Sequence, residues 1–122
     1  MKLLDASAKG KLVVVEGKKD EEALRVLGVS GKVLTIKTGG RSFLEAESEI
    51  EDLGVKGVVL LLDFDRRGKE GTLWLKQGLE RAKIKVDTRF WHDLEALTGR
   101  DIRCIENLPS YLNTLHEKAE PV

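Results

Sequence analysis

The chain has 122 residues, and its 21 Lys and Arg residues balance its 21 Asp and Glu residues. The formal net charge is therefore zero, which excludes a broadly polycationic binder but leaves room for a local basic patch. Charged residues make up 34% of the chain and apolar residues 41%, a balance typical of a folded globular protein. We expect a single domain over residues 1–122, with a core at about 11–90 and a helical C-terminal extension at about 91–122.

Cysteine content and hydropathy indicate the compartment. Cys104 is the single cysteine, which predicts neither an internal disulfide nor a Cys-rich zinc site. Residues 1–10 are too short and too polar for a signal peptide, and no apolar run approaches the ~20 residues of a membrane span. We therefore expect a cytoplasmic protein with no membrane partner.

The predicted elements alternate between strands and helices. Unbroken apolar runs rich in β-branched residues indicate strands buried on both faces, and apolar residues at helical spacing indicate the helices between them. In chain order we expect a strand at 12–15, a helix at 20–27, a strand at 32–37, a helix at 42–53, a strand at 58–62, a helix at about 72–83, a strand at 84–90 and helical pieces at 92–98 and 106–118. Ser42, followed three residues later by Glu45, predicts a capping box for the second helix.

This alternation predicts an α/β fold with an open, mostly parallel four-stranded sheet flanked by helices. The run at 58–62 is the most apolar, so we expect it to be central, whereas the alternating pattern at 84–90 favours a position nearer an edge. In such sheets the functional crevice lies at the carboxyl ends of the strands.

Three carboxylates follow two of the buried strands. Glu16 ends the first strand, and Asp63 and Asp65 follow the third, two residues apart and so on the same side of an extended backbone. Such a cluster is costly through like-charge repulsion unless a hard divalent cation lies between the carboxylates. We predict that Glu16, Asp63 and Asp65 bind one or two Mg²⁺ ions, replaceable by Mn²⁺. Taken singly, Glu16 is compatible with a solvated strand end, and the aspartates with turn and helix-capping residues.

Glycines and basic residues surround the same strand ends. The glycines let the backbone approach a phosphate closely, and the basic side chains favour its charge. The candidate phosphate- or nucleic-acid-binding residues are Gly17, Lys18, Gly39, Gly40, Arg41, Arg66, Arg67, Gly68 and Lys69. The basic residues after the third strand are equally compatible with an ordinary solvated surface.

These residues resemble the Toprim domain, a catalytic fold shared by topoisomerases, bacterial-type primases, small primase-like nucleases and a ribonuclease that matures ribosomal RNA. The resemblance rests on the segments VVVEGKKDEEAL and VVLLLDFDRRGKEG and covers roughly residues 11–90. Glu16 matches the glutamate that closes the first strand of the family, and Asp63 and Asp65 match the DxD motif that closes the third. Gly68 matches the glycine that commonly follows.

A second part of the motif refines the resemblance. Lys18 and Asp20 fit the E-G-K-x-D form of the ribonuclease-like branch. Asp20 is equally compatible with an acidic residue that interacts with the dipole of an early helical turn. Among Toprim proteins the chain is most similar to small stand-alone archaeal ones.

The resemblance implies Mg²⁺ at the acidic cluster, with Glu16 as general acid or base and Asp63 and Asp65 as metal ligands. Topoisomerases and primases rely on further domains that are not apparent in this sequence, and nuclease chemistry needs the least additional machinery. We therefore predict a Mg²⁺-dependent phosphodiesterase, a hydrolase that acts on RNA or DNA. The alternative is a non-catalytic adaptor that binds metal and nucleic acid and whose tail docks a larger protein partner.

A phosphotransfer domain is a third interpretation, because a DxD motif also ends a strand in haloacid-dehalogenase phosphatases. Those enzymes place the motif on their first core strand and follow it with Thr or Val two residues later. Here the motif follows the third strand, and Arg67 occupies that position. The pattern favours the Toprim resemblance.

Overall fold

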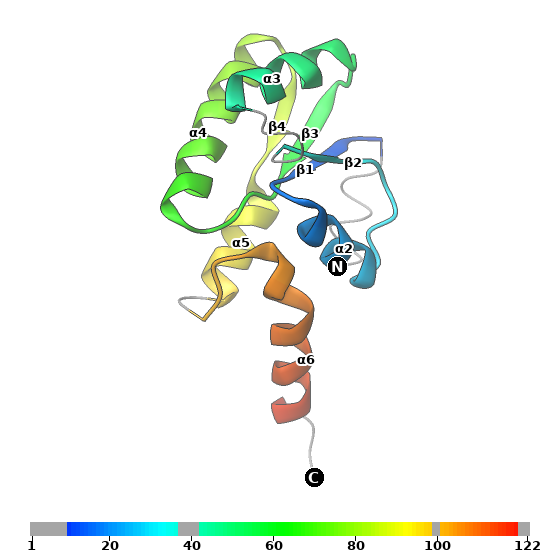
Figure 1. The fold of residues 1–122 in the computed structure, drawn as a ribbon, viewed down its shortest axis with the longest axis vertical. Helices are drawn as coiled ribbons and strands as arrows, with labels where there is room; N and C mark the ends of the chain where they lie inside the picture. The colour runs from blue at the N-terminus through cyan, green and yellow to red at the C-terminus, as the bar shows by residue number, and fades with distance from the viewer. Residues whose placement is uncertain (1–9, 37–41, 99–100, 120–122) are drawn as a thin grey trace.

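The computed structural model describes the backbone of residues 10–36, 42–98 and 101–119. Strands and helices alternate along these ranges (Figure 1). In chain order the elements are β1 (Leu12–Val15), α2 (Lys18–Val26), β2 (Val33–Thr35), α3 (Phe43–Asp52), β3 (Gly57–Leu60), α4 (Arg66–Arg81), β4 (Lys85–Asp87), α5 (Arg89–Thr98), the 3₁₀ helix η1 (Ile105–Asn107) and α6 (Leu108–Ala119).

The four strands form one parallel sheet in the order β2-β1-β3-β4. Val13 of β1 lies between Val33 of β2 and Val59 of β3. This topology confirms the predicted four-stranded parallel sheet, with β3 inside and β4 at an edge. Because β1 and β3 are neighbours, the residues that follow these two strands meet at one edge of the sheet.

Helices cover both faces of the sheet. Helices α3 and α4 lie on one face, and α2 and α5 lie on the other (Figure 1). Alternate residues of β1 divide between the two hydrophobic clusters: Leu12 and Val14 pack towards α3 and α4, and Val13 and Val15 pack towards α2 and α5. Burial on both sides explains why the strands are continuous apolar runs.

The packed core extends beyond residues 11–90. Ile102, Ile105 and Leu108, which follow α5, are buried in the same cluster as Val59 of the sheet. Helix α6 then extends away from the sheet (Figure 1). The segment between α5 and α6 is therefore held against the body of the protein by its own apolar side chains.

The element boundaries differ from the prediction mainly at α4 and β4. Helix α4 begins at Arg66 rather than at about 72, because the Asp65 side chain caps it by accepting a hydrogen bond from the Gly68 N–H at 2.7 Å. Strand β4 ends at Asp87, whose side chain accepts a hydrogen bond from the Arg89 N–H at 2.9 Å as α5 begins. The predicted Ser42 cap is confirmed, since its hydroxyl accepts a hydrogen bond from the N–H three residues later.

Trp91 joins α5 to the segment after β3. Its indole Nε1–H donates to the Leu62 carbonyl at 2.7 Å, and the ring is buried. We expect Trp91→Phe to lower the free energy of unfolding by about 1–3 kcal/mol, because a buried carbonyl loses its donor. Urea unfolding would measure the change, with Trp74→Phe as a control because Trp74 is 38% exposed. Equal effects of the two substitutions would contradict this assignment.

Candidate active site

Glu16 and Asp63 lie side by side where β1 and β3 end. The Asp63 backbone N–H donates to Glu16 Oε2 at 2.9 Å, and the two carboxyl side chains also hydrogen-bond to each other. Glu16 is 2% exposed and Asp63 is 6% exposed. Sequence reasoning placed both residues at this edge, and the parallel pairing of β1 with β3 brings them into contact.

The environment of Asp63 favours its protonated form. Burial, the hydrogen bond that protonated Asp63 donates to Glu16 and the negative charges of Asp20 and Glu16 raise the pKa of the Asp63 carboxyl to about 8, against the opposing hydrogen bond from the Ile105 N–H. Asp63 therefore holds a proton at neutral pH. None of the groups that shift this pKa is basic, so a bound cation would stabilise the ionised carboxylate that burial disfavours.

Asp20 is a third buried carboxyl at the same edge. Its Oδ2 accepts from the Gly17 N–H at 2.9 Å, and its Oδ1 accepts from the Glu106 N–H at 3.0 Å. Burial raises the pKa of Asp20, although both backbone hydrogen bonds oppose the rise. Asp20 thus caps the first turn of α2 and also lies beside the Glu16–Asp63 pair, so both sequence interpretations of this residue contribute.

The segment 101–108, which we call the C-terminal strap, crosses over these carboxyl groups. The Ile105 N–H donates to Asp63 Oδ1 at 3.1 Å, and the next N–H, that of Glu106, donates to Asp20. The Arg103 carbonyl accepts from the Phe64 N–H, which anchors the strap to the end of β3. Sequence reasoning missed the strap because its contacts come from backbone groups, which every residue carries. The only signal was apolar: Ile105 is buried although it lies in a predicted break between helices.

A hollow of about 320 Å³ opens beside the carboxyl groups. Its lining residues are Gly17, Lys18, Lys19, Asp20, Asp63, Cys104 and Glu106. Both lysines are exposed, whereas Glu16 is buried and is not among the residues that line the hollow. Burial and the surrounding negative charges, that of Asp63 first among them, raise the pKa of the Cys104 thiol, so this cysteine is not activated as a thiolate nucleophile.

Asp65 has a different position from Asp63. It is half-buried, and its Oδ1 caps α4, which confirms the capping interpretation for this residue. Among the described residues, which include Glu16, Asp63 and Asp65, no three His, Cys, Asp or Glu side chains are arranged to hold one metal ion. The predicted three-carboxylate ligand set is thus not preassembled.

The chemistry of the Glu16–Asp63 pair nonetheless fits Mg²⁺. This ion is usually bound by one or two carboxylates together with waters and substrate phosphates. The pair offers only oxygen donors, and no basic group is among the causes that shift the Asp63 pKa.

The basic residues predicted after β3 make their contacts along the surface of α4. Arg66 pairs with Glu70 at 3.0 Å, and Lys69 pairs with Glu95 of α5 at 2.8 Å. The Arg67 guanidinium lies over an aromatic ring of α3, 5.6 Å from its centroid. Exposed ion pairs of this kind contribute less than about 1 kcal/mol, so they leave these side chains available to a phosphate.

The candidate glycines divide into two groups. Gly17 precedes α2 and lines the hollow, as does its neighbour Lys18. Gly68 packs against the Asp63 backbone so closely that a Cβ would collide with the Asp63 carbonyl. Packing alone therefore requires glycine at this position, whether or not it contacts a phosphate. The remaining candidates, 39–41, lie outside the described residues.

Comparison with known proteins now identifies the family. Residues 10–88 match the family described as Toprim domain. The chain belongs to the Toprim family. A UPF0292 protein of Methanocaldococcus jannaschii is 40% identical over 111 residues, which cover 90% of this chain and 84% of that protein. A UPF0292 protein of Methanosarcina acetivorans is 30% identical over 118 residues, which cover 97% of this chain and 80% of that protein.

A solved structure supports the same conclusion. A putative protein from Aquifex aeolicus matches 87% of this Toprim chain and 92% of its own, with a TM-score of 0.71 and 25% identity. Family membership gives the protein a metal-dependent, nucleic-acid-related role. In the ranges that the structure describes, no helix is long and apolar enough to cross a membrane.

Proposed function

We propose that this Toprim protein is a Mg²⁺-dependent phosphodiesterase that cuts RNA or DNA. The observation that supports this function is the buried Glu16–Asp63 carboxyl pair, which reaches through Asp63 into a hollow bordered by Lys18 and Lys19. Bound there, one or two Mg²⁺ ions, or Mn²⁺ in their place, would polarise the phosphodiester and activate water.

The residues of the pair have distinct roles in this proposal. Asp63 and Glu16 would hold the cation, and Asp65 would add a ligand from the start of α4. A cation would favour the charged form of Asp63, whose proton would pass to solvent. Glu16 then takes up and returns a proton during cleavage, as a general base and acid.

Positive and backbone groups position the phosphates in this proposal. Lys18 and the Gly17 backbone lie at the N-terminus of α2, where the helix dipole also favours an anion. The second group of contacts comes from the start of α4. The proposed phosphate-binding residues there are Arg66, Arg67, Gly68 and Lys69. Gly39, Gly40 and Arg41, which lie outside the described residues, are part of the same proposal.

A cleavage assay tests the proposal. Labelled single- and double-stranded RNA and DNA would be incubated with Mg²⁺, Mn²⁺ or EDTA. We expect metal-dependent cutting that Asp63→Asn/Asp65→Asn reduces at least about a hundredfold, because it removes two charged ligands. Asp52→Asn/Asp93→Asn is the matched control, since both acids are exposed and lie outside the hollow. Equal activity of the two double variants would refute the proposed ligands.

The adaptor function is the second candidate, and the C-terminal strap favours it. Glu16 is 2% exposed, and Asp63 and Asp20 both accept hydrogen bonds from the strap, an arrangement suited to binding without turnover. Bound metal and nucleic acid without any strand cleavage would support this function. In that case α6 would dock a larger protein partner.

The lone Cys104 fits a reducing compartment, and a cytoplasmic location is part of both proposals.

A further inference from the structure

A second concentration of charge lies at the opposite edge of the sheet, where the strands begin. Lys11, Lys32 and Lys56 each immediately precede a strand, and Lys85 is the first residue of β4. Lys83 belongs to the turn just before β4. Because parallel strands all begin at the same edge, the fold brings these five lysines together, and we call this surface the amino edge.

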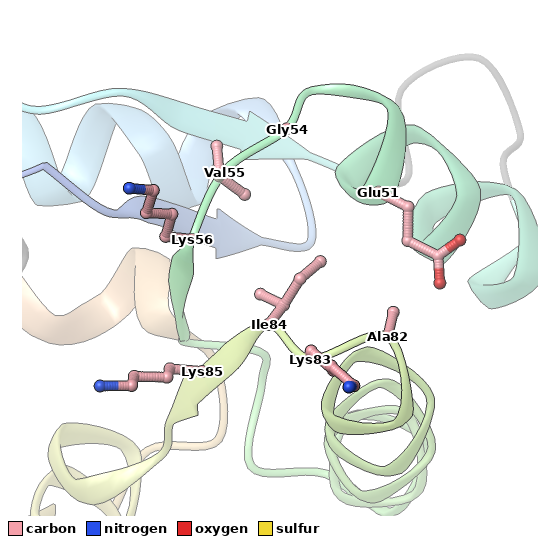
Figure 2. Close-up of a pocket in the computed structure, with 8 residues that line it drawn as sticks. All are labelled: Glu51, Gly54, Val55, Lys56, Ala82, Lys83, Ile84 and Lys85. Carbon is pink, nitrogen blue, oxygen red and sulfur yellow. The ribbon is translucent and has the colours of Figure 1, made fainter.

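Contacts between strands fix the spacing of these lysines. The Lys85 N–H donates to the Lys56 carbonyl at 3.0 Å, and both side chains extend to the same side (Figure 2). The Lys11 side chain lies against Gly57 of β3 and reaches across it towards Asp87 of β4, with 3.9 Å between Nζ and Oδ2. A side chain at Gly57 would occupy this path, so the glycine lets the Lys11 side chain pass over β3.

Three adjoining hollows make the amino edge one continuous surface. The largest, about 610 Å³, has an aliphatic floor and a rim of charged side chains (Figure 2), and its lining residues are Glu51, Gly54, Val55, Lys56, Ala82, Lys83, Ile84 and Lys85. It shares Val55 with a hollow of about 340 Å³ that Lys11 and Lys32 also line. It shares Lys85 with a hollow of about 370 Å³ beside Asp87. The surface therefore runs from β2 to β4.

The charge of the amino edge is strongly unbalanced. Seven basic and three acidic side chains line the three hollows, on a chain whose net charge is zero. In the part of the chain that the structure describes, Lys32, Lys56, Lys83 and Lys85 form no ion pair. Unneutralised charges of one sign along a surface attract a polyanion.

The backbone at Lys83 adds an independent observation. Its φ is 65°, and no other described residue except glycine has a positive φ. A lysine in this left-handed conformation costs about 1 kcal/mol or more relative to glycine. The chain thus has an ammonium group at a position where glycine would be the more stable residue.

We propose that the amino edge binds the phosphate backbone of nucleic acid, independently of sequence and of metal. Ammonium groups act as point charges on phosphates, and no aromatic side chain lines the three hollows to stack on bases. Four strands span about 14 Å at the usual strand spacing, which faces about four phosphates of one duplex strand. The proposal goes beyond the proposed cleavage, because it concerns the opposite edge of the sheet.

Fluorescence anisotropy with labelled RNA and DNA duplexes in EDTA tests this surface. We expect Lys56→Gln/Lys83→Gly/Lys85→Gln to weaken binding at least about tenfold at low salt and to reduce the slope of log Kd against log salt by about 2–3. The triple variant Lys56→Arg/Lys83→Arg/Lys85→Arg keeps the charge and is expected to bind like the unmodified protein. Thermal unfolding of each variant reports whether it is folded, and Lys83→Gly alone is expected to raise the midpoint.

Two results would overturn the proposal. One is an unchanged affinity and salt slope in the folded glutamine-containing variant. The other is displacement of the duplex by polyglutamate at equal charge concentration, which would indicate an acidic protein partner. Failure of the cleavage proposal is seen separately, because that proposal is judged by metal-dependent cutting in the Asp63→Asn/Asp65→Asn variant, whereas the amino edge is judged by binding of the lysine variants in EDTA.

Discussion

Glu16→Gln is expected to lower the rate of metal-dependent cleavage by about two to four orders of magnitude, the usual contribution of one proton-transfer group. Glutamine keeps the carbonyl oxygen that accepts from the Asp63 N–H, so the strand ends remain joined. What it loses is the carboxylate that exchanges a proton beside Asp63. Initial rates on the substrate found by the cleavage assay would measure the effect.

The dependence of that rate on pH separates proton transfer from a purely structural role. The glutamine amide can donate to the Asp63 carboxylate and so lower the Asp63 pKa, which shifts the corresponding limb of the pH profile to lower pH. Glu106→Gln removes one negative charge beside the same hollow without touching the pair, and we expect less than about a threefold change. A Glu16→Gln protein that is fully active would exclude proton transfer by this residue.

The strands and their order follow from the sequence because hydrophobicity carries that information directly. Runs such as Val58–Leu62 have no polar face and must lie inside the sheet, whereas the alternation after Ile84 leaves one side for solvent at an edge. The start of α4 was harder to predict from the sequence. Arg66–Glu70 shows no apolar periodicity, so hydrophobicity did not indicate a helix there. Asp65 is a typical helix-capping residue, but it was interpreted mainly as part of the DxD motif.

The sequence predicted the part of the candidate site that consists of side chains, but not the part that consists of backbone groups. Glu16 and Asp63 were found because strand ends of a parallel sheet meet at one edge, and both are acidic. The contact of the C-terminal strap with Asp63 and Asp20 is made by backbone N–H groups. No residue type encodes such a donor, so only the folded structure shows it.

The amino edge also could not be predicted from the sequence, although here side chains create the surface. Its lysines come from separate parts of the sequence, and Lys11, Lys32 and Lys56 are separated by whole helices. The sequence therefore drew attention to the basic residues after β3, of which Arg66 and Lys69 pair with acids on α4 and α5. Sheet topology, not local composition, gathers these lysines.

Without metal, the stability of the protein is expected to fall as the pH rises from 5 to 8. The folded state raises the pKa of Asp63 from an ordinary 3.8 to about 8, so folding favours its protonated form. This stabilisation is complete below the ordinary pKa and is lost as the pH rises through the folded one. We expect a loss of about 2–4 kcal/mol in the free energy of unfolding across this window, measured by urea unfolding in EDTA.

Asp63→Asn should remove this loss and Mg²⁺ should offset part of it, for different reasons. The asparagine does not titrate and can still accept from the Ile105 N–H, so its stability should be nearly flat between pH 5 and 8. Mg²⁺ at ten times its Kd should stabilise the unmodified protein by about 1.4 kcal/mol at pH 8. The gain should be smaller at pH 5, where protons compete for the same carboxyl group, and absent from Asp63→Asn. Since KCl at equal ionic strength screens charges without occupying the pair, equal stabilisation by KCl would show that this edge holds no specific cation.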